Sequence, residues 1–291
     1  MNHVKEGSVK AWILASRPIT LFGAAVPVMV ALSKVWTEGN SLIWIPSVLC
    51  LLFALVMQID ANFVNDYFDC IKGVDNEDRL GPKRACAQGW ISLPAMKRAI
   101  IATTVLACLI GLPLVYWGGL GMIAIGIACV VFCILYTTLL GRLGMGDVLV
   151  LLFFGIVPVC TTYYIQTKTL DAETLCLSLA CGLVTDCLLI VNNYRDRETD
   201  ARVNKRTLVT FIGARATEWL YLALGIAACL LMAVPLRHNA AWLVLWLVPH
   251  FTVWKRMKAI NHGKELNKIL GQTALNIMLF GAAMCAVYLL S

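Results

Sequence analysis

Residues 42–72 read LIWIPSVLCLLFALVMQIDANFVNDYFDCIK, an apolar run that ends in a group of polar and acidic residues. Between Leu42 and Phe63 the run carries one charged residue, Asp60. About 20 such residues in a helix cross the roughly 30 Å hydrocarbon core of a bilayer. The stretch therefore predicts a transmembrane helix whose last turns reach water at a cluster of acids.

Similar apolar runs recur along the whole chain of 291 residues, which is 60% hydrophobic and 14% charged, with a mean hydropathy of +0.78. Soluble domains carry roughly 25% charged residues. We therefore expect an all-α, multi-pass membrane bundle of nine transmembrane helices, with no room for a sizeable soluble domain. The expected spans are Ile19–Val35, Leu42–Phe63, Ala99–Trp117, Leu120–Leu140, Val148–Ile165, Leu175–Val191, Leu220–Leu236, Ala240–Trp254 and Ile269–Leu290.

The twelve cysteines lie mostly inside these apolar runs, and no Cys-x-x-Cys pair occurs. We therefore expect small buried thiols rather than a disulfide framework or a metal-thiolate site. The polar start of the chain lacks the form of a signal peptide, because Arg17 and Pro18 interrupt the apolar stretch that follows it. We expect this N-terminal segment to stay attached.

Lysines and arginines gather on one predicted side of the membrane. All but Lys34, Lys168 and Arg237 fall in the N-terminal segment or after the second, fourth, sixth and eighth spans. The positive-inside rule makes these segments cytoplasmic and places the C-terminus outside. The formal net charge of +7 is then one-sided, and contact with anionic membrane lipid is enough to explain many of these residues.

Two clusters of polar and acidic residues lie beside that positive charge. Each has an asparagine, an aspartate four residues later and a second aspartate one turn further on: Asn62, Asp66 and Asp69 where span two ends, and Asn192, Asp196 and Asp200 where span six ends. At about 100° per residue, each set falls on one face of a helix. The clusters are offset by 130 residues, since Asn62 corresponds to Asn192 and Asp66 to Asp196.

This offset predicts an internal repeat within a single domain that covers residues 1–291. The repeat halves are expected at about 10–140 and 147–256, followed by a ninth helix at 267–290. Both clusters face the same side of the membrane, so the two halves are parallel rather than inverted.

Neighbouring carboxylates on one helix face repel one another and lose hydration at a membrane boundary, so a bound cation stabilises them. Mg²⁺ favours carboxylate and amide oxygens and usually takes one or two carboxylates together with water and substrate phosphate. The clusters, with the basic residues beside them, therefore predict a site for a magnesium diphosphate. The alternative for a single cluster is local pairing in a solvated loop, such as Asp196 with Arg195 or Arg197.

At these residues the chain resembles the UbiA superfamily of intramembrane prenyltransferases, and within it the 1,4-dihydroxy-2-naphthoate polyprenyltransferases of menaquinone biosynthesis. The resemblance covers nearly the whole chain. Its motifs are RPITL at 17–21, NDYFDCIKGVDNEDRLGPKR at 65–84, LYTT at 135–138, GMGDVLVLLFFG at 144–155, TYYIQT at 162–167 and NNYRDRETDARVNKRTL at 192–208. The broader superfamily has a further aspartate where this chain has Gly73, and the next acid here is Asp75, as in the naphthoate branch. The stretch from Tyr136 to Asp147 is shorter than is usual in that branch, and Arg142 is its one basic residue.

The resemblance implies a Mg²⁺-dependent reaction in which a polyprenyl diphosphate loses its diphosphate and the allylic carbon joins an aromatic ring. For 1,4-dihydroxy-2-naphthoate the prenyl group takes the place of a carboxylate that leaves as CO2, giving demethylmenaquinol. The expected Mg²⁺ ligands are Asn62, Asp66, Asp69, Asn192, Asp196 and Asp200. The expected catalytic residues are Asp66, Asp69, Asp196, Asp200, Lys72 and Asp147. The further substrate-binding residues are expected to be Arg17, Arg84, Tyr136, Lys205, Arg206 and Asp186 in addition to the two asparagines.

Two acids outside the clusters are also expected to have functional roles, Asp147 through the resemblance and Asp186 through its depth in the membrane. Asp147 lies at the cytoplasmic start of span five, where the resemblance suits it to orient the acceptor or assist its deprotonation. Asp186 lies ten residues before Asp196, about 15 Å deeper by helical rise, where an acid is a functional candidate by default. Asp60 and His250 are expected to have structural roles within the bundle.

Two alternatives stay open at this point. Another aromatic acceptor, such as 4-hydroxybenzoate or homogentisate, fits the same clusters. A cation-coupled secondary transporter also uses repeats and intramembrane acids, although its ligands belong near the midplane rather than at the helix ends. We expect polyprenyl diphosphate, 1,4-dihydroxy-2-naphthoate and membrane lipid as partners, no nucleic acid, and a location in a bacterial cytoplasmic (inner) membrane. The oligomeric state is left open.

Overall fold

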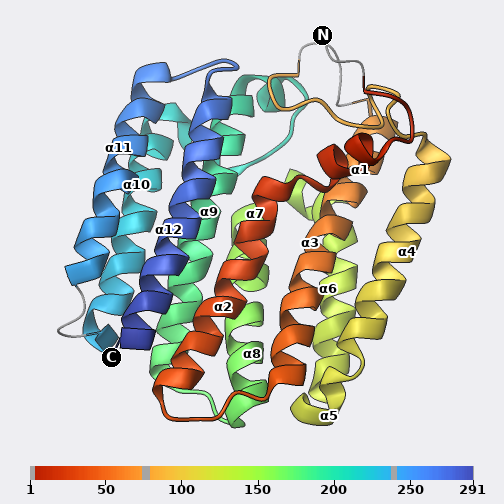
Figure 1. The fold of residues 1–291 in the computed structure, drawn as a ribbon. Coiled ribbons are helices and arrows are strands. Elements are labelled where there is room, and N and C mark those ends of the chain that lie inside the picture. The colour runs from red at the N-terminus through yellow and green to blue at the C-terminus, as the bar shows by residue number, and fades with distance from the viewer. Residues whose placement is uncertain (1–3, 74–78, 237–240, 291) are drawn as a thin grey trace.

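The computed structural model describes residues 4–73, 79–236 and 241–290, and these residues form a bundle of long helices that run side by side (Figure 1). Asp75 and Arg237 lie outside the described residues. No strand occurs in the described ranges, where an isolated bridge joins Leu143 and Arg206. The expected all-α membrane fold is therefore confirmed.

The helices follow the expected spans but differ from them at several ends. The chain order is α1 (Val9–Ser16), η1 (Pro18–Thr20), α2 (Leu21–Thr37), α3 (Trp44–Ile71), α4 (Leu93–Gly111), α5 (Leu114–Gly118), α6 (Gly121–Thr138), η2 (Leu140–Arg142), α7 (Gly146–Leu151), η3 (Leu152–Ile156), α8 (Val157–Thr167), α9 (Ala172–Arg202), α10 (Leu208–Leu236), α11 (Ala241–Ile260) and α12 (Leu266–Leu290). Helices α3 and α9 continue beyond their apolar runs, because their acidic ends pack against protein rather than lipid.

The expected count of nine spans is not confirmed. By length and composition, eight stretches of the described residues qualify as membrane spans: Val9–Thr37, Trp44–Ile71, Leu93–Gly111, Gly121–Thr138, Gly146–Thr167, Ala172–Arg202, Leu208–Ala233 and Leu266–Leu290. The expected eighth span lies in α11, which is 20 residues long but carries Lys255, Arg256 and Lys258 in its last turns. The protein is a multi-pass integral membrane protein, and the two-repeat organisation stays a prediction.

The first and fifth spans are each interrupted. Arg17 has a φ of 48°, so the chain turns between α1 and α2 and places this arginine just before the start of α2. The fifth span contains a π-helical turn, η3, between α7 and α8. Such turns shift the register of the following side chains, and this one brings Phe153 and Phe154 onto the wall of the cavity described below.

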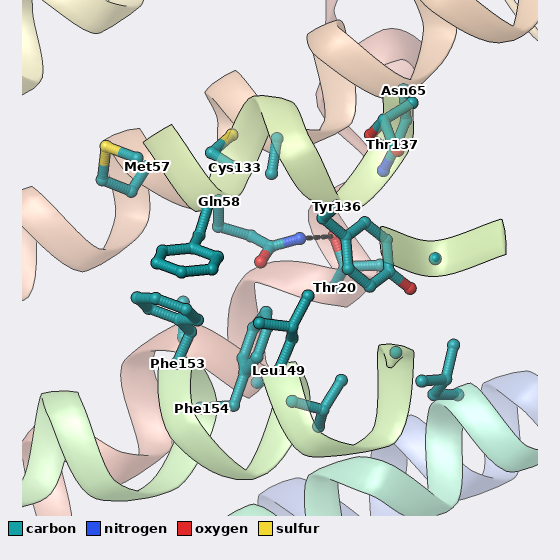
Figure 2. A pocket seen from close by; sticks show the side chains of 18 of the residues that line it. Thr20, Met57, Gln58, Asn65, Cys133, Tyr136, Thr137, Leu149, Phe153 and Phe154 are labelled. Atoms are coloured by element: carbon teal, nitrogen blue, oxygen red, sulfur yellow. Dashed lines mark hydrogen bonds between the residues drawn. The ribbon is translucent and has the colours of Figure 1, made fainter. Parts of the chain in front are cut away.

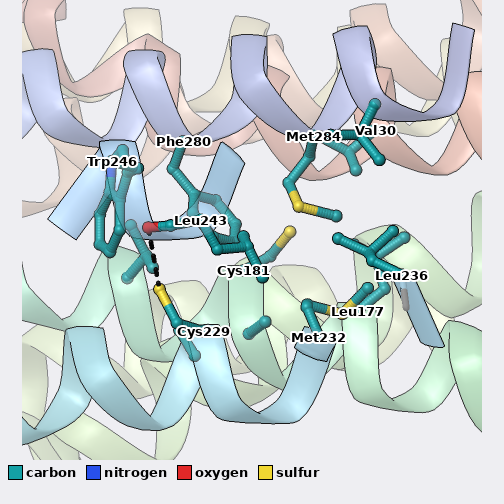
Figure 3. Packing of buried hydrophobic residues seen from close by; sticks show 14 of the residues in the cluster. Val30, Leu177, Cys181, Cys229, Met232, Leu236, Leu243, Trp246, Phe280 and Met284 are labelled. Carbon is teal, nitrogen blue, oxygen red and sulfur yellow. Dashed lines mark hydrogen bonds between the residues drawn. The ribbon is translucent and has the colours of Figure 1, made fainter. Parts of the chain in front are cut away.

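A core of buried apolar side chains joins α2, α8, α9, α10, α11 and α12 (Figure 3). Cys181 and Cys229 pack in it among leucines and methionines as small apolar residues. Beside this core, His250 is 1% exposed and stacks between the rings of Tyr221 and Trp246, at centroid distances of 4.8 and 5.0 Å. Its expected structural role agrees with this packing.

Alanine in place of Gly225 is expected to destabilise the protein. A Cβ at residue 225 would overlap the His250 ring, which cannot move away because it is stacked on both faces. Overpacking of this kind costs about 1–3 kcal/mol, more than the ~1 kcal/mol that alanine gains over glycine in a helix. A thermal unfolding experiment in detergent should show a lower Tm. Gly121→Ala is the control, since a Cβ there has no neighbour within 4 Å, and an equal fall in its Tm would contradict the argument.

A buried lysine lies at the end of the bundle opposite the acidic clusters. Lys34 on α2 is 1% exposed. Its Nζ pairs with Glu38 and lies 2.8 Å from Asp171 Oδ2 at the start of α9. Tyr163 on α8 donates a hydrogen bond to each of these carboxylates, at 2.7 and 3.1 Å. This polar network ties α2, α8 and α9 together at that end.

Candidate active site

A cavity of about 960 Å³ runs through the bundle between α2, α3, α6, α8 and α9. One end of its wall carries the aspartates of both acidic clusters, and its deeper wall is mainly apolar. Figure 2 shows part of the cavity wall, where Phe153 and Phe154 lie beside the Gln58 side chain, whose amide donates a hydrogen bond to Thr20 Oγ1 at 3.2 Å. A polar head and an apolar body of one ligand could therefore bind along the same cavity.

The first acidic cluster lies on α3. Asp66 is 1% exposed, and its two carboxylate oxygens accept the backbone N–H groups of Ala85 and Cys86, each at 2.9 Å. This contact holds the loop after α3 against the cavity, whose wall Asp66 also forms. Asp69 lines the cavity as well, with Oδ2 at 3.6 Å from Nη2 of Arg84.

Asn62, the third member of this cluster, does not line the cavity. Its amide nitrogen donates to the Ser16 carbonyl at 2.8 Å and to Thr20 Oγ1 at 2.9 Å. Arg17 donates to the Asn62 carbonyl at 3.4 Å and itself lines the cavity. Asn62 therefore anchors the turn that presents Arg17, and Asn65 is the asparagine of α3 that reaches the cavity wall.

The second acidic cluster lies on α9 and is organised by Arg195, a residue that is 2% exposed. Its guanidinium donates to both carboxylate oxygens of Asp196, at 2.8 and 2.6 Å, and to Asn192 Oδ1 at 2.8 Å. Asp200 pairs with Lys205 at 3.0 Å. The local pairing of Asp196 with Arg195 is thus present, but Asn192, Asp196 and Asp200 all line the cavity rather than a solvated loop.

The loop of residues 79–86 brings the two clusters together. Asn267, at the start of α12, accepts a hydrogen bond from Arg195 Nη1 at 2.9 Å and donates one to the Leu80 carbonyl at 2.8 Å. A Cβ at Gly81 would lie 2.8 Å from Arg195 Nη2, so glycine lets the loop approach this close. The first cluster holds one end of the loop through Asp66, and the second holds the other end through Arg195.

Eight basic residues line the cavity: Arg17, Arg79, Lys83, Arg84, Arg142, Arg195, Arg202 and Lys205. Two further predicted contacts lie elsewhere. Lys72 donates to the carbonyls of Thr137 and Thr138, at 3.3 and 3.0 Å, and so caps the end of α6. Burial and the nearby Arg142 lower the pKa of Lys72, while Asp69 raises it. Arg206 is exposed, and its backbone N–H donates to the Arg142 carbonyl at 3.1 Å.

A group of oxygen-bearing side chains lies beside the clusters. Tyr136 and Asp147 line the cavity, and Asp186, which is 3% exposed, lies behind the wall and interacts electrostatically with Asp147. One oxygen of each aspartate, Oδ1, is buried without a hydrogen-bond partner among the described residues. Asp60 is separate, accepting hydrogen bonds from Thr103 and Thr104 of α4, in keeping with its expected structural role.

The sequence pattern missed four residues that the structure brings to this site: Asn65, Gln58, Arg79 and Asn267. Asn65 lies four residues before Asp69, so the helical spacing that selected Asn62 could also have selected it. Arg79 lies inside the quoted loop motif. Neither Gln58 nor Asn267 has a local signal, because Gln58 lies within an apolar run and Asn267 reaches the site from the last helix.

The donor set fits magnesium held with a phosphate better than a closed protein cage. No group of three or more histidine, cysteine, aspartate or glutamate side chains that could hold a metal by itself occurs in the described part of the chain. The cavity instead presents two pairs of aspartates, with Asn65 and Asn192 beside them. Mg²⁺ commonly takes one or two carboxylates and completes its shell with water and substrate phosphates.

Residues 24–270 match the model of the UbiA prenyltransferase family. The chain belongs to this family. The 1,4-dihydroxy-2-naphthoate octaprenyltransferase of Escherichia coli K12 is 36% identical over 222 residues, covering 73% of this chain and 72% of that protein. The protein of the same name from Mycobacterium tuberculosis H37Rv is 31% identical over 283 residues, covering 95% of this chain and 96% of that protein. The predicted resemblance is confirmed, and this UbiA protein is an aromatic prenyltransferase.

The solved structure of a UbiA homologue from Archaeoglobus fulgidus bound to DMAPP and Mg²⁺ shares the fold, with a TM-score of 0.68 over 95% of this chain and 98% of that chain. The two sequences are 15% identical. At this identity the likeness concerns the arrangement of helices, which independently agrees with the family match.

Proposed function

We propose that this UbiA protein transfers a polyprenyl group from a polyprenyl diphosphate to 1,4-dihydroxy-2-naphthoate in a Mg²⁺-dependent reaction, with loss of diphosphate and CO2, giving demethylmenaquinol. The observation that carries the proposal is one cavity whose wall holds the four aspartates of the two clusters and eight basic residues, with a mainly apolar wall beyond them. Relatives named 1,4-dihydroxy-2-naphthoate octaprenyltransferase support the choice of acceptor, and the homologue bound to DMAPP and Mg²⁺ supports the choice of donor and metal.

Asp66, Asp69, Asp196, Asp200 and Asn192 are the residues that would hold Mg²⁺ with the diphosphate. Bound there, the metal would neutralise charge on the leaving diphosphate oxygens. Arg195 fixes the orientation of Asn192 and Asp196 before any ligand binds. Preorganised donors of this kind favour the transition state because they need little rearrangement during the reaction.

The basic residues on the wall would bind the remaining diphosphate oxygens, with Arg17, Arg84 and Lys205 the best placed of the predicted set. Lys72 and Arg206 would act from further away, since Lys72 caps α6 and Arg206 is exposed. Asn62 would contribute by anchoring Arg17 rather than as a ligand.

The acceptor is proposed to bind beside Tyr136 and Asp147, next to the diphosphate site. A ring hydroxyl donating to the unpartnered Oδ1 of Asp147 would make the ring a stronger nucleophile. The allylic C–O bond breaks with its electron pair on the diphosphate, and a ring carbon bonds to the allylic carbon. The C–CO2 bond then breaks and returns its electrons to the ring, so no net proton is lost. Asp186 would hold Asp147 in place from behind the wall.

The orientation in the membrane is also part of the proposal. With the basic loops inside, the N-terminus and the diphosphate site face the cytoplasm and the C-terminus lies outside, in a bacterial inner membrane. Both substrates then reach the site from the side on which charged metabolites are made, and the product stays in the lipid.

The direct test uses the purified protein with Mg²⁺, a labelled octaprenyl diphosphate and each aromatic acid in turn. We expect CO2 release and a prenylated product from carboxyl-labelled 1,4-dihydroxy-2-naphthoate. Parallel reactions with EDTA should give no product, because the diphosphate would keep its charge. Product from 4-hydroxybenzoate together with none from the naphthoate would select the other acceptor and reject the proposal.

A further inference from the structure

Gln58 is a polar side chain in an otherwise apolar part of the cavity wall. It lies on α3, where the five residues before it, 53–57, read FALVM. The side chain is partly buried and lines the cavity, and neither the magnesium site nor the diphosphate site proposed above uses it. Polar groups in apolar surroundings are costly unless they form hydrogen bonds. The partners of the Gln58 amide therefore show what it is placed to bind.

The hydrogen bonds around Thr20 fix which way the Gln58 amide faces. The Thr20 hydroxyl donates its one proton to the Arg17 carbonyl at 2.9 Å, so Oγ1 can only accept from the amides of Gln58 and Asn62, at 3.2 and 2.9 Å. The Gln58 nitrogen, Nε2, must therefore point to Thr20, as the dashed line in Figure 2 shows. The oxygen, Oε1, accepts no hydrogen bond from the residues that the structure describes. Gln58 thus offers one unused acceptor on the cavity wall.

Aromatic side chains flank this acceptor. Phe132, Phe153 and Phe154 all line the cavity, and the rings of Phe132 and Phe153 lie 5.6 Å apart between centroids. Phe153 and Phe154 come from the π-helical turn of the fifth span and lie beside Gln58 (Figure 2). Aromatic rings pack well against other rings, by stacking or by edge-to-face contact. This part of the wall therefore suits a flat aromatic ring that carries a hydroxyl group.

The depth of the Gln58 amide relates it to Asp147, the proposed partner of the acceptor. Phe154 packs against α2 at Gly23, where a Cβ would lie 3.7 Å from its ring. Thr20, which holds the Gln58 amide, lies about one turn before Gly23, and Asp147 lies about two turns before Phe154. Both helices start at the acidic end of the bundle (Figure 1). The amide therefore lies about one turn, roughly 5 Å, deeper than Asp147.

We propose that Gln58 determines acceptor specificity, with its Oε1 accepting a hydrogen bond from the C4 hydroxyl of 1,4-dihydroxy-2-naphthoate while Asp147 Oδ1 accepts one from the C1 hydroxyl. The inference rests on the proposed function for the identity of the acceptor. Two hydroxyls on opposite corners of one ring suit two acceptors that differ in depth by about one helical turn. An acceptor without the C4 hydroxyl leaves Oε1 unpaired in apolar surroundings, which weakens its binding.

The two hydroxyls have different chemical roles. The C1 hydroxyl is adjacent to C2, the carbon that receives the prenyl group, and so it feeds electron density to the reacting atom. The C4 hydroxyl is meta to C2 and does not activate it directly. Gln58 therefore selects the acceptor, whereas Asp147 assists the formation of the new bond. 4-Hydroxybenzoate has a single hydroxyl and cannot form both hydrogen bonds.

The test removes the acceptor atom and the C4 hydroxyl in turn. Gln58→Leu and the unmodified protein are each assayed with 1,4-dihydroxy-2-naphthoate and with 1-hydroxy-2-naphthoate, which keeps the C1 hydroxyl and the carboxylate. We expect the unmodified protein to prefer the dihydroxy compound, and Gln58→Leu to lower the ratio of the two kcat/KM values by about tenfold, the effect of one hydrogen bond. Any shared loss through Thr20 and Arg17 cancels in this ratio. Met57→Leu, at the adjacent residue of the cavity wall, is the control and should leave the ratio unchanged.

A binding experiment separates this inference from the proposed function. Ligands that bind the folded protein raise its Tm, so each naphthoate is added without a polyprenyl diphosphate. The dihydroxy compound should raise the Tm of the unmodified protein more than the monohydroxy compound does, and the two should act equally on Gln58→Leu. Equal losses with both acceptors in Gln58→Leu, or no preference in the unmodified protein, would overturn the inference and leave the proposed function in place. An unmodified protein that neither binds nor prenylates either naphthoate would overturn both.

Discussion

Asparagine in place of Asp69 or Asp196 is expected to lower kcat by about 10²- to 10³-fold, the loss that follows removal of one group that stabilises developing charge. Each change keeps the shape of the side chain and removes one negative charge from the cavity wall. The Mg²⁺ concentration needed for half-maximal activity should rise at the same time. The reason is that the loss of one carboxylate weakens Mg²⁺ binding more than it weakens the binding of the diphosphate to the arginines. Initial rates at several Mg²⁺ concentrations measure both effects.

The matched control is Glu198→Gln, the same acid-to-amide change on α9. Glu198 is exposed and does not line the cavity, and it lies 3.9 Å from Arg197. Its activity and its Mg²⁺ dependence should stay within about twofold of the unmodified protein, since an exposed pair contributes little. Full activity in both Asp69→Asn and Asp196→Asn would remove the acidic clusters from the mechanism.

The two Asp variants should differ in stability. Asp196 accepts two hydrogen bonds from Arg195, which is 2% exposed. Its amide would leave part of that buried guanidinium without a partner, whereas Asp69 makes a longer contact with Arg84, at 3.6 Å. Of the two, Asp69→Asn is therefore the cleaner measure of the contribution of charge to catalysis.

Much of the site could be predicted because its acids repeat at helical spacing beside apolar runs. Asp66, Asp69, Asn192, Asp196 and Asp200 all line one cavity, as their shared faces suggested. Spacing could not tell which asparagine of α3 faces inward, since that depends on how the helix rotates against its neighbours. Asn62 turns toward Ser16 and Thr20 instead, at 2.8 and 2.9 Å.

The contacts that join distant parts of the chain left no trace in local patterns. Asn267 meets Arg195 and the Leu80 carbonyl only because α12 packs beside α9 and the loop after α3 folds over both. Gly81 was part of a quoted motif, but its reason is the guanidinium 2.8 Å from where a Cβ would lie.

Methionine in place of Lys34 is expected to give the largest loss of stability outside the active site. Lys34 Nζ is buried among Glu38, Asp171 and Tyr163, and lies 4.5 Å from the centroid of the Tyr163 ring. Methionine keeps the apolar stem and leaves two carboxylates without their cation. Breaking a buried pair costs about 3–5 kcal/mol; Glu38 and Asp171 are 33% and 43% exposed, so we expect about 2–3 kcal/mol. Thermal unfolding in detergent should show this as a lower Tm.

A double variant and a pH series isolate the ion pair from packing. Asp171→Asn alone should also lower the Tm, while Lys34→Met combined with it should lower the Tm by less than the sum of the two single changes, because the pair is lost only once. Burial raises the pKa of Asp171, but the hydrogen bonds from Lys34 and Thr174 and the charge of Lys34 together outweigh it and lower the pKa to about 2. Since the ordinary value is about 3.9, the stabilisation is complete above pH 4 and is lost as the pH falls toward 2. The unmodified protein should lose Tm across that range, and Lys34→Met should lose less; parallel losses in both proteins would show that the pair contributes nothing to stability.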